Sequence, residues 1–288
     1  MLVLAYVAYL GTLYLFVSHP ELLRKTRMSE AGTYGAYLKI DELLALQQPR
    51  DEVEHDEVLF IVIHQVYELW FKVVIHETDY CGRLLGAQDT PRALHTLKRV
   101  LSIVKVLVAQ LDILETMTPS EFLTFRERLD SASGFQSDQF RALEFTLGKK
   151  SRASVERFDE GTRARDSLEA RWAAPTVWDA FLHYLASDGY AVPADQTGRD
   201  VTTNIEPSLG VQAILVDIYR NDTKNAALCE RLVDLDEGIQ EWRYRHVKMV
   251  ERTIGMKHGT GGSAGSEYLR TTLNTQLFPD LWAIRGQL

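Results

Sequence analysis

Residues 94–114, LHTLKRVLSIVKVLVAQLDIL, carry the pattern that decides the fold. Their apolar side chains recur at every third or fourth position: Leu94, Leu97, Leu101, Val104, Val108, Leu111, Ile113 and Leu114. This spacing is the period of an α-helix with one apolar face, so it predicts a long helix packed against other elements. The following Thr118-Pro119-Ser120-Glu121 is a capping box with proline at the first helical position, which predicts that a new helix begins there.

Helical spacing continues through most of the chain after residue 40. We expect further helices at residues 55–82, 136–147, 176–185, 207–219 and 226–254. No segment alternates convincingly with period 2, and the one Asp-Gly pair, at 188–189, follows a helical stretch instead of joining two strands. The sequence therefore predicts an all-α helical bundle, formed as a single domain by residues 28–288.

The first 18 residues, MLVLAYVAYLGTLYLFVS, are almost wholly apolar. No basic residue precedes this run and no small-residue cleavage site follows it, which disfavours a signal peptide. One interpretation is a short membrane anchor, in which case the basic residues among 24–27 keep the body of the chain in the cytoplasm. The other is that Met28 is the true start and residues 1–27 are an upstream-start artefact. Under both, we expect a cytoplasmic body that contacts a membrane only if residues 1–27 are a real anchor.

Charge and cysteine content argue against several classes of protein. Lys and Arg total 32 against 40 Asp and Glu, a net charge of −8, whereas a nucleic-acid partner calls for a basic face. The two cysteines, Cys81 and Cys229, are too few for a disulfide framework or a cysteine-rich zinc or iron–sulfur site. There is no Cys-x-x-Cys-His motif for covalent haem attachment. The 8 histidines therefore remain the main candidates for metal ligands.

Two histidines fall where packing alone predicts apolar residues. His64 lies within residues 55–82, which are apolar around nearly the whole helix, and Phe60 precedes it by one turn on the same face. His246 interrupts the apolar stripe of residues 226–254 at a position that suits leucine. Burying an imidazole without a partner costs about 1–3 kcal/mol. A backbone carbonyl or a carboxylate is one possible partner; an iron-bearing macrocycle between two helices is the other.

A third candidate site precedes the Ser133-Gly134 pair. Phe122 and Arg126 share one helix face, so the guanidinium could hold a carboxylate beside an aromatic wall. The alternative is a surface arginine paired with Glu127 or Asp130, which contributes little to stability. Both interpretations stay open on the residues alone.

Residues 255–265, GMKHGTGGSAG, contain five glycines and join two helical stretches. Such a composition does not form a stable helix. It is typical of a slack linker, and also of a loop that wraps a ligand and offers backbone N–H groups to it. On composition alone the linker is the favoured interpretation.

Four blocks of the sequence resemble the tryptophan 2,3-dioxygenase family and follow one another in the family's order. They are residues 33–44 (TYGAYLKIDELL), 55–77 (HDEVLFIVIHQVYELWFKVVIHE), 133–145 (SGFQSDQFRALEF) and 242–265 (WRYRHVKMVERTIGMKHGTGGSAG). The resemblance covers essentially the whole chain after Met28. It implies an all-α homotetramer, a dimer of dimers, with one b-type haem per subunit. It also implies an activity: ferrous haem and O2 open the indole C2–C3 bond of L-tryptophan to give N-formyl-L-kynurenine, a step of tryptophan catabolism by the kynurenine pathway.

The resemblance assigns roles residue by residue. His246 matches the iron ligand, and His64 matches the catalytic distal histidine that hydrogen-bonds the indole N–H. The other matches concern substrate binding. Phe60 matches a wall of the indole pocket, and Arg126, with Phe122 beside it, matches the clamp on the substrate carboxylate. Thr260 matches the contact with the substrate ammonium, and Tyr34 and Tyr37 match tyrosines that enter a neighbouring subunit's pocket. Ser133 matches a hydroxyl near the haem edge.

The chain also departs from the family pattern, at Val66, Phe122, Asp138, His258 and Ala264. None of these positions removes a matched ligand or the arginine clamp. Relatives of this fold in secondary metabolism insert one oxygen atom, so the alternative is a haem monooxygenase acting on a substituted tryptophan. A haem sensor or carrier without turnover is less consistent with the sequence, because holding haem requires neither His64 nor Arg126.

Overall fold

The computed structural model describes residues 32–50, 53–129, 133–255, 257 and 265–288, and every regular element within these ranges is helical. The all-α prediction is thereby confirmed for the described chain. Two compact units are present, one containing described residues 32–48 and the other the described residues from 49 onward. The single domain expected over residues 28–288 stays a prediction, and residues 1–27 lie outside the described residues.

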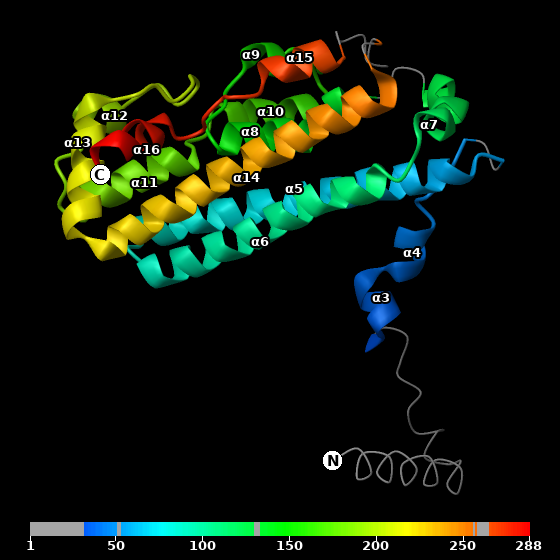
Figure 1. Cartoon of the computed structure of the whole chain (residues 1–288). Coiled ribbons are helices and arrows are strands. Elements are labelled where there is room, and N and C mark those ends of the chain that lie inside the picture. The colour runs from blue at the N-terminus through cyan, green and yellow to red at the C-terminus, as the bar shows by residue number, and fades with distance from the viewer. Residues whose placement is uncertain (1–31, 51–52, 130–132, 256, 258–264) are drawn as a thin grey trace, which may run out of the picture. The chain divides into compact units, whose positions relative to one another are not determined.

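The first unit holds two short helices, α3 (Tyr34–Leu38) and α4 (Ile40–Leu44) (Figure 1). The Thr33 side chain caps α3 by accepting a hydrogen bond from the Ala36 backbone N–H at 3.2 Å. Lys39 separates the two helices because its backbone is left-handed, with φ of 55°, and so interrupts the helical path.

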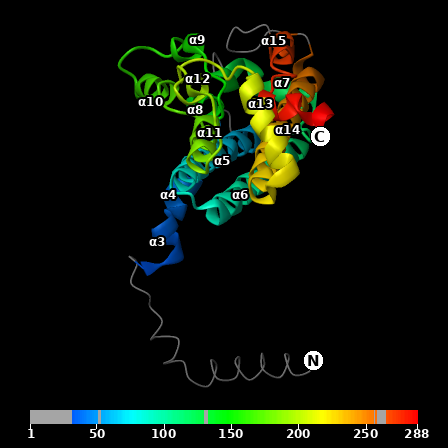
Figure 2. The same ribbon diagram turned by 90° about the vertical axis from the view of Figure 1, so that its left-hand side faces the viewer.

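Three long helices form the core of the second unit: α5 (His55–Gly86), α6 (Thr90–Leu114) and α14 (Thr223–Ile254). α6 packs against both α5 and α14, and the views in Figures 1 and 2 show the three running alongside one another. The contact between α14 and α6 is close at Gly238, where a Cβ atom would lie 2.8 Å from the Val104 side chain. Any larger residue at that crossing would force the Val104 side chain to shift.

Shorter elements surround the core. α8 (Asp138–Thr146) and α11 (Val177–Ser187) pack against α5, and α13 (Leu209–Asn221) packs against α14. The remaining elements are α7 (Pro119–Arg126), η2 (Glu127–Leu129), η3 (Gly134–Gln136), α9 (Arg152–Val155), α10 (Arg163–Trp172), α12 (Ala194–Thr197), α15 (Ser266–Thr271), α16 (Pro279–Ala283) and η4 (Arg285–Gln287).

The predicted helices are found with small shifts at their ends. α6 begins at Thr90, earlier than the apolar spacing predicts, because the Asp89 side chain caps it by accepting from the Arg92 backbone N–H. The capping box at Thr118 is present and begins α7 as predicted. The single helix predicted at residues 136–147 is wrong in one respect: Ser137 caps α8, so Gln136 belongs to the separate turn η3.

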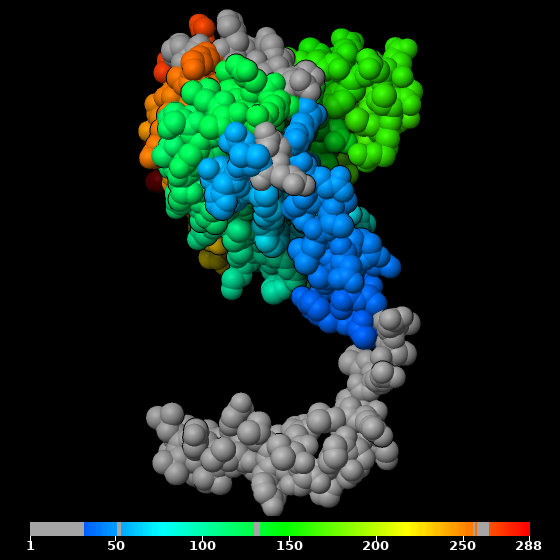
Figure 3. All heavy atoms as spheres, turned by 90° about the vertical axis from the view of Figure 1, so that its right-hand side faces the viewer, coloured from blue at the N-terminus to red at the C-terminus, as the bar shows by residue number. Residues whose placement is uncertain are grey.

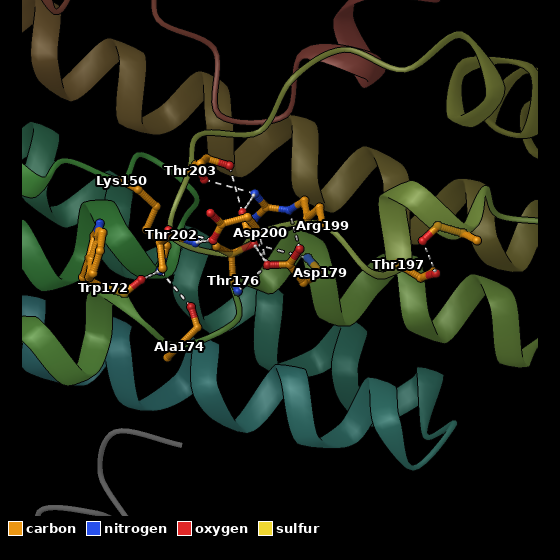
Figure 4. Close-up of polar contacts among 11 residues, drawn as sticks. Lys150, Trp172, Ala174, Thr176, Asp179, Thr197, Arg199, Asp200, Thr202 and Thr203 are labelled. Carbon is orange, nitrogen blue, oxygen red and sulfur yellow. Dashed lines mark hydrogen bonds and ion pairs between the residues drawn. The ribbon is translucent and has the colours of Figure 1, made fainter.

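α9 and α10 form a lobe at one edge of the second unit, visible in green in Figures 2 and 3. Lys150 fastens this lobe (Figure 4). Its buried ammonium donates hydrogen bonds to the carbonyl oxygens of Arg171 at 3.0 Å, Trp172 at 3.0 Å and Ala174 at 2.8 Å. Carbonyls at a helix C-terminus have no partner within the helix, so a buried cation there both satisfies them and fixes where α10 ends.

Candidate functional site

A cavity of about 280 Å³ in the second unit is lined by residues of α5, α6, α7, α8, α14 and α15, and of the turns η2 and η3. The fold brings six of the residues singled out in the sequence to its wall: Phe60, His64, Phe122, Arg126, Ser133 and His246. Many of the other lining side chains are apolar, among them Leu111, Leu114 and Met117. The cavity is therefore an apolar chamber with a small number of polar groups, which is typical of a ligand site.

His64 lines the cavity from the first third of α5. Its Nδ1 lies 2.7 Å from the carbonyl oxygen of Phe60, one turn earlier on the same helix. Because a carbonyl oxygen only accepts, Nδ1 carries the hydrogen, and Nε2 is left as an acceptor. Burial lowers the pKa of His64, opposed by the Phe60 hydrogen bond and the charge of Glu68, so the neutral imidazole is the form present at pH 7.

An aromatic wall stands beside His64. The Phe60 ring centroid lies 4.1 Å from that of His64, 5.8 Å from Phe122 and 5.5 Å from Phe125. Phe125 is fully buried and was not singled out in the sequence analysis, although it lies three residues from Phe122 on α7. Tilted and edge-on contacts of this kind fix ring positions, and Phe60 and Phe122 give the cavity an aromatic side.

His246 faces the same cavity from α14. The Trp242 ring, one turn earlier, stacks on it with centroids 5.2 Å apart and an interplanar angle of 14°. Burial, with smaller contributions from the nearby His64 and Arg141, lowers the pKa of His246 to about 4. A neutral imidazole held flat against an indole keeps a ring nitrogen available as a metal ligand.

Arg126 is the last residue of α7 and is half-buried at the cavity wall. Its position there favours the interpretation of a group that meets a ligand over that of a surface arginine. Ser133 also lines the cavity and begins η3, where its side chain accepts from the Phe135 backbone N–H at 3.3 Å.

Charged residues that the sequence analysis missed also line the cavity. Arg141 and Glu144 come from α8, Arg243 from α14, and Glu68 from α5, one turn after His64. Arg141 and Glu144 lie inside the block 133–145 at a three-residue spacing, which was a signal for an ion pair on one helix face. Glu144 also pairs with Arg243, 99 residues further along the chain, and no spacing in the sequence predicts a contact over that separation.

The description of the cavity does not test three of the predicted site residues. Thr260 lies outside the described residues, as do His258 and Ala264. Tyr34 and Tyr37 lie on α3 in the first unit, where they are 74% and 83% exposed. That these tyrosines reach a neighbouring subunit's pocket stays a prediction.

Comparison with known proteins gives one consistent result. The family model described as "Tryptophan 2,3-dioxygenase" matches residues 22–171 and 198–288. A protein of that name from Herpetosiphon aurantiacus is 58% identical over 262 residues, covering 91% of this chain and 100% of the relative. A second from an Anaeromyxobacter strain is 56% identical over 260 residues, and a third from Bacillus cereus is 38% identical over 266. The alignments cover 90% and 91% of this chain and 97% and 95% of those relatives.

Proposed function

This chain belongs to the tryptophan 2,3-dioxygenase family, and from that membership we propose that it opens the indole ring of L-tryptophan with O2, using a bound haem. The observation that carries the proposal is that His64 on α5 and His246 on α14 line one apolar cavity. One histidine is thereby available to an iron atom and the other to a substrate.

The residues of the cavity fit a haem. His246 is neutral at pH 7 and is held in place by its stack on Trp242. In the described part of the chain no group of three or more His, Cys, Asp or Glu side chains could hold a bare metal ion. A porphyrin would bring four nitrogens to its iron and would need one protein imidazole, which His246 would provide. A ferrous b-type haem held by His246 would supply the activation of O2.

The side chains around the cavity would bind and orient the amino acid. Arg126 presents a planar fork that suits the substrate carboxylate, and Phe60 and Phe122 form an apolar face for the indole. The Nε2 of His64 would accept a hydrogen bond from the indole N–H, because Nδ1 is already committed to the Phe60 carbonyl. We assign contact with the substrate ammonium to Thr260 on the family resemblance alone. Fixing both ends of the substrate orients the C2–C3 bond for reaction.

The departures from the family pattern give little support to a monooxygenase acting on a substituted tryptophan. Of the departures that fall within the described residues, only Phe122 lines the cavity, and it keeps an aromatic ring there. Asp138 pairs with Arg163 at 3.6 Å, and Val66 is not among the lining residues. The described cavity wall therefore differs little from what the dioxygenase requires.

A product assay tests the proposed function. Haem-loaded protein is reduced under anaerobic conditions and given L-tryptophan and then ¹⁸O2. Mass spectrometry then measures how many labelled oxygen atoms the product contains. We expect N-formyl-L-kynurenine carrying two labelled atoms. A product with one labelled atom supports the monooxygenase instead, and loaded, reduced protein that forms no product overturns both.

We also propose that the chain assembles as a homotetramer, a dimer of dimers. Val58, Val62 and Leu69 lie on one face of α5 and are 44%, 37% and 49% exposed. α5 is long and apolar enough to cross a membrane by composition alone, but its other faces pack against α6, α8 and α11. An exposed apolar stripe on a core helix favours burial against another copy of the chain. Light scattering on the purified protein measures the mass directly, and a monomer or dimer would contradict the proposal.

The body of the chain is proposed to work in the cytoplasm, with membrane contact only if residues 1–27 act as an anchor. The basic residues among 24–27 support this orientation. Fractionating cells that express the full chain, beside cells that express a chain starting at Met28, separates the two interpretations. An anchored protein sediments with membranes only when residues 1–27 are present.

A further inference from the structure

An ion cluster at the cavity wall carries more positive than negative charge. The Glu144 carboxylate is buried and contacts three cations: Arg141 Nη1 at 2.5 Å, Arg243 Nη2 at 3.0 Å and Lys149 Nζ at 3.4 Å. One negative charge is therefore shared among three positive ones. Arg243 is only 4% exposed, so solvent does little to offset its charge.

Two guanidinium nitrogens of this cluster have no hydrogen-bond partner among the described residues: Nε of Arg141 and Nη1 of Arg243. Both arginines line the cavity. A buried charged donor left unpaired is costly, and a bound water, ion or ligand is one way to complete it. The other carboxylate at the cavity wall, Glu68, accepts from Gln139 at 3.0 Å and forms no ion pair with either arginine in the described structure.

Both arginines lie near His246. Arg243 precedes His246 by three residues on α14, and the Arg141 charge acts on the His246 imidazole. Arg126, the clamp proposed for the amino acid, comes from α7 instead. The cavity wall thus takes cations from three helices: Arg141 from α8, Arg243 from α14 and Arg126 from the end of α7.

We propose that Arg141 and Arg243, held together by Glu144, form a carboxylate subsite that binds a propionate of the macrocycle. The proposal rests on the haem of the proposed function. A carboxylate has two oxygens, so it would accept charge-assisted hydrogen bonds from both guanidinium groups. The negative charge of the carboxylate would also offset the surplus positive charge of the cluster. An apolar edge of a ligand would not.

The test compares haemin with haemin dimethyl ester, in which both propionates are esterified. Dissociation of each macrocycle from the full-length protein is followed by transfer to excess apomyoglobin. We expect haemin to leave the wild type at least tenfold more slowly than the ester. Arg141→Gln and Arg243→Gln should each speed the release of haemin, and in the double variant the two macrocycles should leave at similar rates, as a double-mutant cycle requires.

Matched controls keep the result specific. Lys149→Gln removes a cation from the same carboxylate, but Lys149 does not line the cavity, so haemin release should stay within twofold of the wild type. Arg243→Lys keeps the charge and should restore part of the slow release. Circular dichroism of each apo-protein establishes that the variants fold, which is expected because Glu144 keeps two cations in every single variant.

A second arm distinguishes the macrocycle from the amino acid as the source of the carboxylate. The affinities of L-tryptophan and L-tryptophanamide are compared by their effect on the Soret band. We expect the preference for the free carboxylate to survive both arginine substitutions. Loss of that preference, or equal release of haemin and its ester from the wild type, overturns the subsite while leaving the dioxygenase assignment intact. A wild type that takes up neither macrocycle overturns the proposed function itself, and the subsite with it.

Discussion

The carbonyl oxygen of Phe60 holds Nδ1 of His64 at 2.7 Å, so the fold of α5 itself selects which nitrogen of this imidazole carries the hydrogen. Position i−4 in an α-helix ordinarily accepts from a backbone N–H, and here the side chain shares that acceptor. No other side chain is needed to orient the ring. The free nitrogen is therefore an acceptor as long as the imidazole stays neutral, and this makes its protonation measurable through catalysis.

The first prediction concerns pH. Because burial lowers the pKa of His64, the neutral form should persist as the pH falls through the ordinary histidine value of 6.5. Protonation turns Nε2 into a donor that no longer accepts from the indole N–H. The acid limb of kcat/KM should therefore lie below pH 6.5 in the wild type and be absent in His64→Ala, whose activity we expect to be lower by roughly 10²–10⁴-fold, as for loss of a positioned acid–base group.

The control for this prediction is the haem content, which should be the same in both proteins because His246 is unchanged. An acid limb centred above pH 6.5 in the wild type, or one that persists in His64→Ala, would show that another group titrates. 1-Methyltryptophan, which has no indole N–H, should be less sensitive to the substitution than L-tryptophan.

The second prediction concerns the iron ligand. His246→Ala should yield protein without a stable haem, measured by the Soret absorbance per subunit after loading with haemin and desalting. Added imidazole should restore part of the absorbance by occupying the space of the missing ring. His183→Ala is the matched control, because His183 is exposed on α11 and does not line the cavity. Full native Soret intensity in His246→Ala would contradict the ligand assignment.

The third prediction concerns the carboxylate clamp. Arg126→Leu should raise KM for L-tryptophan roughly 100-fold with little change in haem content, since a charge-assisted hydrogen bond contributes about 1.5–3 kcal/mol. Tryptamine lacks the carboxylate, so its KM should be nearly the same in the variant and the wild type. Arg128→Leu, two residues further on, is the control because Arg128 pairs with Glu54 at 3.6 Å and does not line the cavity. If Arg126→Leu left the KM for L-tryptophan unchanged, Arg126 would have no role in binding the carboxylate.

Local patterns predicted those parts of the molecule that depend on local physics. The apolar spacing of α6 and the capping box at Thr118 each specify a helix from a few neighbouring residues, and both are found. His246 was noticed because it interrupts an apolar stripe, and the structure shows that the stripe faces a cavity at that point. A polar residue in an otherwise apolar helix face was thus an informative signal.

Contacts between distant segments could not be predicted in the same way. Glu144 meets Arg243 across 99 residues, and Lys150 reaches carbonyls more than 20 residues away. Such pairings depend on how the helices pack, not on the spacing within any one of them. The roles of Tyr34 and Tyr37 depend on a further step, the arrangement of a second copy of the chain.

The fourth prediction concerns Lys150 and the lobe formed by α9 and α10. Lys150→Met keeps the aliphatic stem and removes the ammonium, leaving the carbonyls of Arg171, Trp172 and Ala174 without that donor in a buried position. We expect a loss of about 2–3 kcal/mol in the free energy of unfolding, the range for a hydrogen-bonded buried charge. The loss is measured by urea denaturation of the apo-protein. Hydrogen exchange should locate it, with faster exchange in α10 and little change in α6.

Lys224→Met is the control for this prediction. The Lys224 ammonium pairs with Asp188 at 2.8 Å, but its side chain is 49% exposed, so its removal should cost less than about 1 kcal/mol. Haem uptake should be unchanged in both variants, because neither lysine lines the cavity. Equal destabilisation by the two substitutions would mean that burial gives Lys150 no advantage over a surface ion pair, and that the end of α10 is fixed by packing of the lobe rather than by the ammonium.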